Sequence, residues 1–153
     1  MNDEPIICEV MEAYSHDAVD LAQEYCGETL DFSEESIETV EWCLGRFHES
    51  IPKGFFGNLF RRGPSTEEIE IVARVFGGYI GEVYRKHHGG EWILDDSIPG
   101  ATGPIVTLHQ SNGGKFFPTM KVYKRLTAGP EDNVWAYYRV LARELDKSGN
   151  EQG

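Results

Sequence analysis

One predicted helix carries a line of small residues through its middle. Apolar residues recur at spacings of three and four from about 66 to 88, a pattern that predicts an amphipathic helix. Ala73, Gly77 and Gly81 step by four, so they stack along one side of this helix. Each interior glycine costs a helix about 1 kcal/mol relative to alanine. Small residues along one side leave a groove on the helix surface, and this cost is tolerated where another backbone or an aromatic ring approaches closely. We therefore expect this helix to be central to the fold.

The remaining patterns predict a single α+β domain over residues 1–147, in which a helical layer packs on a small antiparallel sheet of about three strands. Further helices are expected at 5–26, from Ser33 to before Pro52, at 121–128 and at 131–146, and strands at 91–95, 105–109 and 115–118. Asn112-Gly113 is a strong hairpin signal between the last two strands. We expect residues 148–153 to be a disordered tail.

A loop rich in glycine and aromatic residues is expected at 52–64. If its Phe55, Phe56 and Phe60 are exposed, they form a docking element beside Arg61 and Arg62. The alternative is that these rings fold back onto the core. The sequence leaves the role of this loop open.

Negative charge is concentrated at the start of the chain. Residues 1–50 contain 14 acidic residues and one Lys or Arg, Arg46, whereas the whole chain has a net charge of −12. A strongly acidic face repels nucleic acids and anionic membranes and attracts a basic protein partner. The alternative is a solvated surface that aids solubility. The expected partner-binding residues are Glu9, Glu12, Asp17, Asp20, Glu24, Glu34, Glu35, Glu38 and Glu41.

Known catalytic and cofactor motifs are absent from the sequence. It has no Walker loop, no GxGxxG after a strand, no HExxH and no GxSxG, so we predict no catalytic residue, cofactor or metal site. Cys8, Cys26 and Cys43 are widely spaced and are expected to be reduced thiols in a cytoplasmic protein. No signal peptide and no apolar run of about 20 residues is visible.

The glycine groove has a functional alternative. A carboxylate, an imidazole and an aromatic ring beside bare backbone would bind a small polar ligand or support a weak hydrolase. The residues that fit this hypothesis are Gly77, Gly81, Glu82, Trp92 and His109. Close packing, with Glu82 in a structural role, is the competing interpretation. A contact between two copies of the chain, giving a homo-oligomer, is the third.

Several blocks of the sequence resemble a family of small bacterial cytosolic proteins described as a domain of unknown function. The blocks are Phe76-Gly-Gly-Tyr-Ile-Gly-Glu-Val, Gly90-Glu-Trp, Lys121-Val-Tyr-Lys-Arg-Leu and Gly129-Pro-Glu-Asp, and the resemblance covers about 73–140. The family implies an α+β domain and supplies no established activity. In size and charge the chain is also similar to immunity proteins that neutralise toxins. We therefore expect a non-catalytic, cytosolic protein that binds a basic partner.

Overall fold

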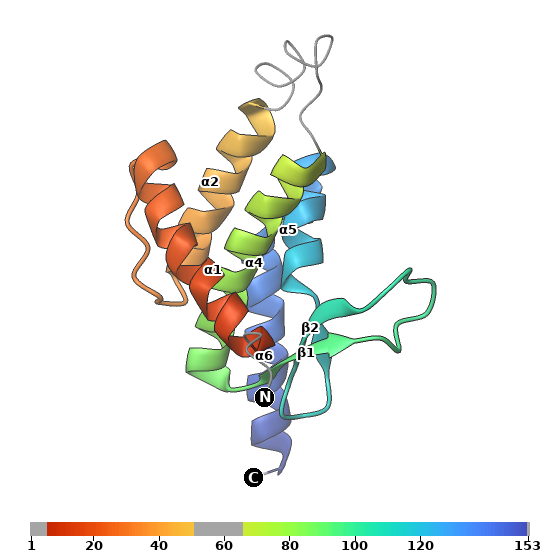
Figure 1. Ribbon diagram of the computed structural model, residues 1–153. Helices are drawn as coiled ribbons and strands as arrows, with labels where there is room; N and C mark the ends of the chain where they lie inside the picture. Colours follow the sequence, from red (N-terminus) through yellow and green to blue (C-terminus); the bar gives the residue numbers. More distant parts are fainter. Residues whose placement is uncertain (1–5, 51–65, 153) are drawn as a thin grey trace.

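Five α-helices and a three-stranded sheet make up the part of the chain that the computed structural model describes, residues 6–50 and 66–152 (Figure 1). The elements in chain order are α1 (Ile7–Leu21), the π-helical turn η1 (Ala22–Cys26), α2 (Ser36–Ser50), α4 (Thr66–His88), β1 (Glu91–Asp95), β2 (Ile105–His109), β3 (Lys115–Phe116), α5 (Pro118–Thr127), the 3-10 turn η3 (Pro130–Asp132) and α6 (Val134–Gln152). The predicted α+β class, with a helical layer on a small antiparallel sheet, is confirmed.

Helix α4 lies between the other helices and contributes more buried hydrophobic residues to the core than any other element. It packs chiefly against α1 and α5, and its end also contacts α6 (Figure 1). The side chains that it buries recur at three and four residues, as one inward stripe of a helix does. This stripe consists of Ala73, Phe76, Tyr79, Ile80, Val83 and Tyr84, and Val75 is buried beside it. The expectation that this helix is central to the fold is therefore correct.

The sheet is a simple antiparallel meander, with strand order β1-β2-β3. Trp92 pairs with Leu108, and Leu108 pairs with Phe116, so these three buried side chains share the face that packs on the helices. The hairpin predicted at Asn112-Gly113 is present, because Gln110 N donates to Gly114 O at 2.7 Å and Gly113 has φ 92°. Strand β3 is shorter than expected, with two residues.

Two helices differ from the sequence prediction at their ends. Helix α5 begins at Pro118, which we expected at the end of a strand, because proline suits the first turn of a helix, where no N–H partner is needed. Helix α6 begins at Val134 and continues to Gln152, through residues where we expected a tail. No proline follows residue 130, so nothing in the sequence forces that helix to stop earlier.

The connection between η1 and α2 is held against α4 by a buried hydroxyl. Tyr79 Oη accepts from Phe32 N at 2.8 Å and lies 2.5 Å from Ser36 Oγ. Phe32 has φ 62°, an uncommon conformation for a bulky residue, and its ring packs on Tyr79. Ser33 caps helix α2, as the sequence predicts, because its Oγ accepts a hydrogen bond from Ser36 N at 3.2 Å.

The loop with Phe55, Phe56 and Phe60 lies outside the described residues.

Candidate functional site

Other elements of the protein fill the space beside the glycines of α4. A Cβ at Gly81 would overlap the outer edge of the Trp92 ring, and a Cβ at Gly77 would lie 2.6 Å from Thr119 Cα, at the start of α5. On another side of the helix, a Cβ at Gly78 would lie 2.9 Å from Tyr14 Cβ of α1. The groove expected at Gly77 and Gly81 is therefore a packing surface, and it offers no space to a ligand or to a second copy of the chain.

Beside this packed surface, two neighbouring side chains donate hydrogen bonds to Glu82. Its Oε2 accepts from Trp92 Nε1 at 3.0 Å and from Arg85 Nη1 at 2.6 Å. Burial lowers the pKa of the Arg85 guanidinium, but the hydrogen bond and the charge of Glu82 outweigh burial and raise that pKa. The arrangement positions the indole ring, and this is the structural role that competed with the ligand hypothesis.

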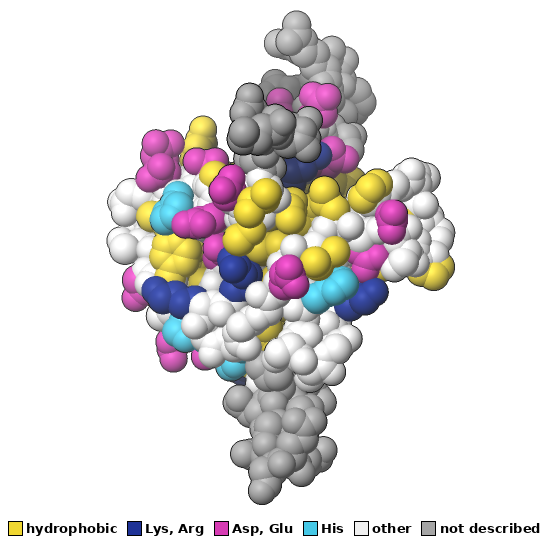
Figure 2. All heavy atoms as spheres, turned by 60° about the horizontal axis from the view of Figure 1, so that its bottom comes forward, with side chains coloured by type: hydrophobic (Ala, Val, Ile, Leu, Met, Phe, Trp, Pro, Cys, Tyr) yellow, Lys and Arg dark blue, Asp and Glu magenta, His cyan; other side chains and the backbone are white. Residues whose placement is uncertain are grey.

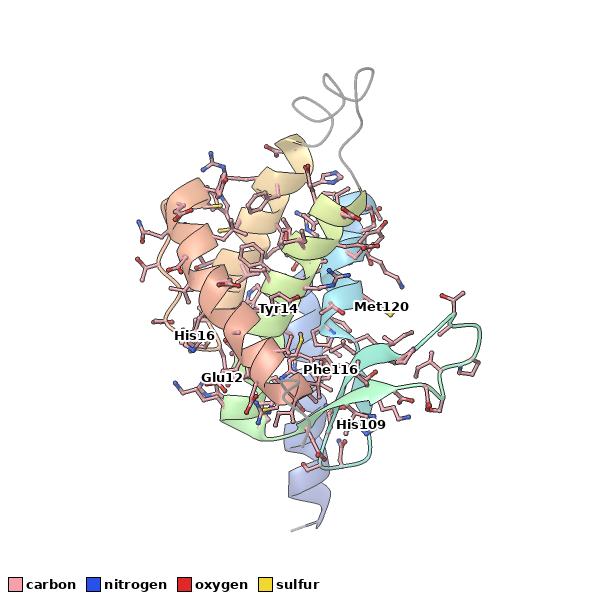
Figure 3. The ribbon with its side chains drawn as sticks, viewed as in Figure 1. Glu12, Tyr14, His16, His109, Phe116 and Met120 are labelled. Atoms are coloured by element: carbon pink, nitrogen blue, oxygen red, sulfur yellow. The ribbon has the colours of Figure 1, made fainter. Side chains whose placement is uncertain are left out.

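A hollow of about 360 Å³ lies beside this pair, on the side of α1. Figure 3 shows two of its lining residues, Glu12 and His16, on α1. The remaining lining residues are Ser15, Phe32, Glu82, Arg85 and Lys86. Trp92, which the hypothesis placed beside Glu82 in a ligand site, does not line this hollow.

His109 is not part of the same cluster, which corrects the expected grouping. Adjacent residues of a strand point to opposite faces, so His109 lies on the other face of the sheet from Leu108 and Trp92. There His109 Nε2 lies 3.3 Å from Asp95 Oδ2, and Lys115 Nζ donates to the same oxygen at 2.9 Å. Hydrogen bonds from Ser97 and Lys115 hold the pKa of Asp95 well below its usual range.

The acidic residues expected to bind a partner fall into two groups. Seven are exposed and have no ion pair within 4.0 Å among the described residues, and they are Glu9, Glu12, Asp17, Asp20, Glu24, Glu35 and Glu38. Figure 2 shows acidic side chains along the α1 side of the molecule, with a hydrophobic area between them and the sheet. Glu34 and Glu41 are partly buried and bind other parts of the protein.

Glu34 connects the start of α2 to α4 and α6. Its Oε2 accepts from Tyr138 Oη at 2.5 Å and lies 2.8 Å from His88 Nε2. Burial raises the pKa of this carboxyl, but the hydrogen bonds of Tyr138 and His88 outweigh it, so the pKa of Glu34 is lowered. Burial and the same hydrogen bond raise the pKa of Tyr138 far above its usual range. Glu34 is therefore a structural residue.

Glu41 binds a buried arginine. Arg125 Nε donates to both of its carboxylate oxygens, at 3.0 and 2.8 Å, and Arg125 Nη2 lies 2.7 Å from Oε2. Val134 N, at the start of α6, donates to Glu41 Oε1 at 2.9 Å. The Arg125 side chain is only 5% exposed, and its Nη1 has no hydrogen-bond partner among the described residues. A buried guanidinium with one free donor is unusual, because buried polar groups are nearly always satisfied.

The α2–α6 hollow opens beside this ion pair and has a volume of about 580 Å³. Trp42 is 48% exposed in it, and the Arg46 guanidinium stacks 5.0 Å from the centre of the Trp42 ring. Gly45 makes room for the buried arginine, since a Cβ there would lie 3.0 Å from Arg125 Nη2. The residues that line the hollow are Glu38, Glu41, Trp42, Gly45, Arg46, Glu49, Arg125, Asn133 and Trp135.

Sequence reasoning found Glu38 and Glu41 but missed Arg125, Trp135 and Glu49. The sequence does contain a signal for the burial of Arg125, because this residue lies on the same side of its helix as Val122 and Leu126, which are buried. A charged residue in a buried stripe indicates a buried partner of opposite charge. Nothing in the sequence shows that α6 meets α2, so the hollow itself could not be predicted.

Comparison with models of protein families, with curated proteins and with solved structures found no match. Among the described residues, no group of three or more His, Cys, Asp or Glu side chains is arranged to hold a metal ion. Over the same residues, no helix combines the length and the apolar character needed to cross a bilayer.

Proposed function

We propose that this chain is a non-catalytic protein of the cytoplasm that binds a basic protein partner through α1 and α2. The observation that carries the proposal is the set of seven exposed acidic residues without ion pairs among the described residues. Unpaired surface charges of one sign steer an oppositely charged partner and set its orientation. An immunity-type role, in which the partner is a toxin, is one form of this proposal.

The positions of these acids on α1 support a single contact surface. Glu9, Glu12, Asp17 and Asp20 are spaced by three to five residues, so they spread over one broad side of a helix of 3.6 residues per turn. The opposite side of α1 is buried through Met11, Ser15 and Ala18. Glu34 and Glu41 are excluded from the proposed contact, since both bind groups within the protein.

We do not propose the small-molecule or hydrolase alternative. Trp92 and Thr119 fill the space at Gly81 and Gly77 that a ligand would need, and His109 lies on the other face of the sheet from Trp92. A homo-oligomer stays a prediction, although not through this groove.

Affinity capture with charge-reversed variants tests the proposal. The test variant carries E12K, D17K and D20K on α1, and the matched control carries E91K, D96K and E131K at exposed acids elsewhere. Each changes the net charge by six units. We expect the wild type and the control to capture the same basic protein at low salt and to release it at high salt, because exposed charges are screened.

The test variant is expected to lose that partner. Circular dichroism of all three proteins checks that the fold persists. A partner that both triple variants retain or lose to the same degree would show that the α1 acids do not form the contact.

A further inference from the structure

The α2–α6 hollow has the length of a short peptide. Glu38 and Glu49 both line it and are separated by three turns of α2. Eleven residues of α-helix rise by about 16 Å, and an extended chain advances about 3.3 Å per residue. An extended segment of about five residues would therefore reach from one carboxylate to the other.

The buried arginine provides a reason for a backbone to lie there. Arg125 lines the hollow, and its Nη1 has no partner among the described residues. The missing partner is a hydrogen-bond acceptor. Three carboxylates, those of Glu38, Glu41 and Glu49, line the hollow together with the guanidiniums of Arg46 and Arg125, so the negative charges outnumber the positive ones and a neutral acceptor fits better than a phosphate or a carboxylate. A main-chain carbonyl is neutral and is available in any extended peptide.

The tryptophans provide surfaces for basic side chains. Arg46 lies over the exposed Trp42 ring, and Arg139 lies 5.5 Å from the centre of the Trp135 ring. Both rings thus already carry cations of the protein itself, in the geometry of a cation–π contact. An incoming lysine or arginine would find the same kind of surface. At each end of the hollow lies a carboxylate, Glu38 or Glu49, that has no ion pair among the described residues.

We propose that the α2–α6 hollow binds an extended segment of the basic partner, about five residues long, with a basic side chain at each end. Its end side chains pair with Glu38 and Glu49, and a carbonyl between them accepts a hydrogen bond from Arg125 Nη1. This inference rests on the proposed function, since it names how the basic partner is recognised. Arg46 competes with the segment for the Trp42 ring and weakens binding.

Fluorescence anisotropy with a defined probe tests this site. The probe is a fluorescein-labelled pentapeptide, blocked at both ends, with lysine at its first and fifth positions and glycine or alanine between them. A second probe has glutamine in place of both lysines. We expect the lysine probe to bind at low salt and the glutamine probe to bind far more weakly.

Matched variants separate this site from general attraction by charge. Loss of two exposed ion pairs in E38Q/E49Q is expected to weaken binding of the lysine probe about 2- to 30-fold. The control E91Q/D96N, with the same net charge and exposed acids outside α1 and α2, is expected to bind as the wild type does. R46Q is expected to bind more tightly than R74Q, which removes a comparable exposed charge from α4.

Equal weakening by the two double variants would overturn the proposed site, while the capture experiment on α1 could still support a basic partner. Tighter binding by R46Q and R74Q alike would show that only net charge matters. R125K keeps the positive charge but lacks Nη1, so it is expected to bind the lysine probe more weakly than the wild type does. Probe binding by R125K equal to that of the wild type, with an unchanged unfolding midpoint, would overturn the carbonyl contact.

Discussion

Replacement of Gly81 by alanine is the most direct test of how α4 is packed. In an isolated helix the change would stabilise by about 1 kcal/mol. In this fold the new Cβ would overlap the far edge of the buried Trp92 ring, so the indole must move. Overpacking of a core costs about 1–3 kcal/mol. A moved ring also loses its 3.0 Å hydrogen bond to Glu82, and hydrogen bonds to charged groups contribute about 1.5–3 kcal/mol.

The sum of these effects is a net loss of about 1.5–5 kcal/mol for G81A. Urea unfolding, followed by circular dichroism, measures the change in the free energy of unfolding. For a domain of this size the melting temperature falls by about 2–4 °C for each kcal/mol lost. Both measurements are expected to agree in sign.

A double-mutant cycle with W92F isolates the cause. Phenylalanine lacks both the far edge of the indole and its N–H, so the clash and the hydrogen bond are already removed. In this background G81A is expected to be neutral or to stabilise by up to about 1 kcal/mol, through helix propensity alone. Equal destabilisation in both backgrounds, or stabilisation of the wild type, would refute the reasoning.

Three further changes test the structural roles of buried groups. E41Q leaves the charge of buried Arg125 without its partner and is expected to cost about 3–5 kcal/mol in urea unfolding. E34Q is expected to cost about 1–3 kcal/mol at pH 7. The lowered pKa of Glu34 means that its contribution is present above about pH 4 and is lost as the pH falls, so unfolding at pH 3 should show a smaller difference. G77A forces the backbone of α5 to move and should lower the melting temperature, whereas G103A, with nothing within 4 Å, should not.

The sequence predicted the elements well because their signals are local. The apolar stripe and small residues of α4, the Asn112-Gly113 turn and the Ser33 cap each depend on neighbours a few residues away. The proximity of Glu82 and Trp92 also follows from local order, because only a short turn joins the end of α4 to β1. Tertiary contacts over longer distances were not accessible in this way.

Two errors have clear physical reasons. The predicted grouping of His109 with Trp92 ignores the alternation of side chains along β2, which places His109 opposite the face of buried Leu108. The burial of Arg125 is not predicted, because charged residues are rarely buried unless they are paired. Its partner, Glu41, lies 84 positions earlier in the chain, so no local pattern links the two.

The glycines of α4 also limit which changes in length the chain can accept. Gly77, Gly78 and Gly81 admit α5, α1 and the Trp92 ring in turn, each at its own angle around one helix. An inserted residue turns everything that follows by about 100°. An insertion after Gly78 would therefore preserve the contacts of Gly77 with α5 and of Gly78 with α1. It would, however, move a bulky side chain into the position of Gly81, against the indole ring of Trp92. Insertions between β1 and β2, where Gly100 and Gly103 face open space, would leave these three contacts intact. Natural variation in length is thus expected in that connection and not in α4.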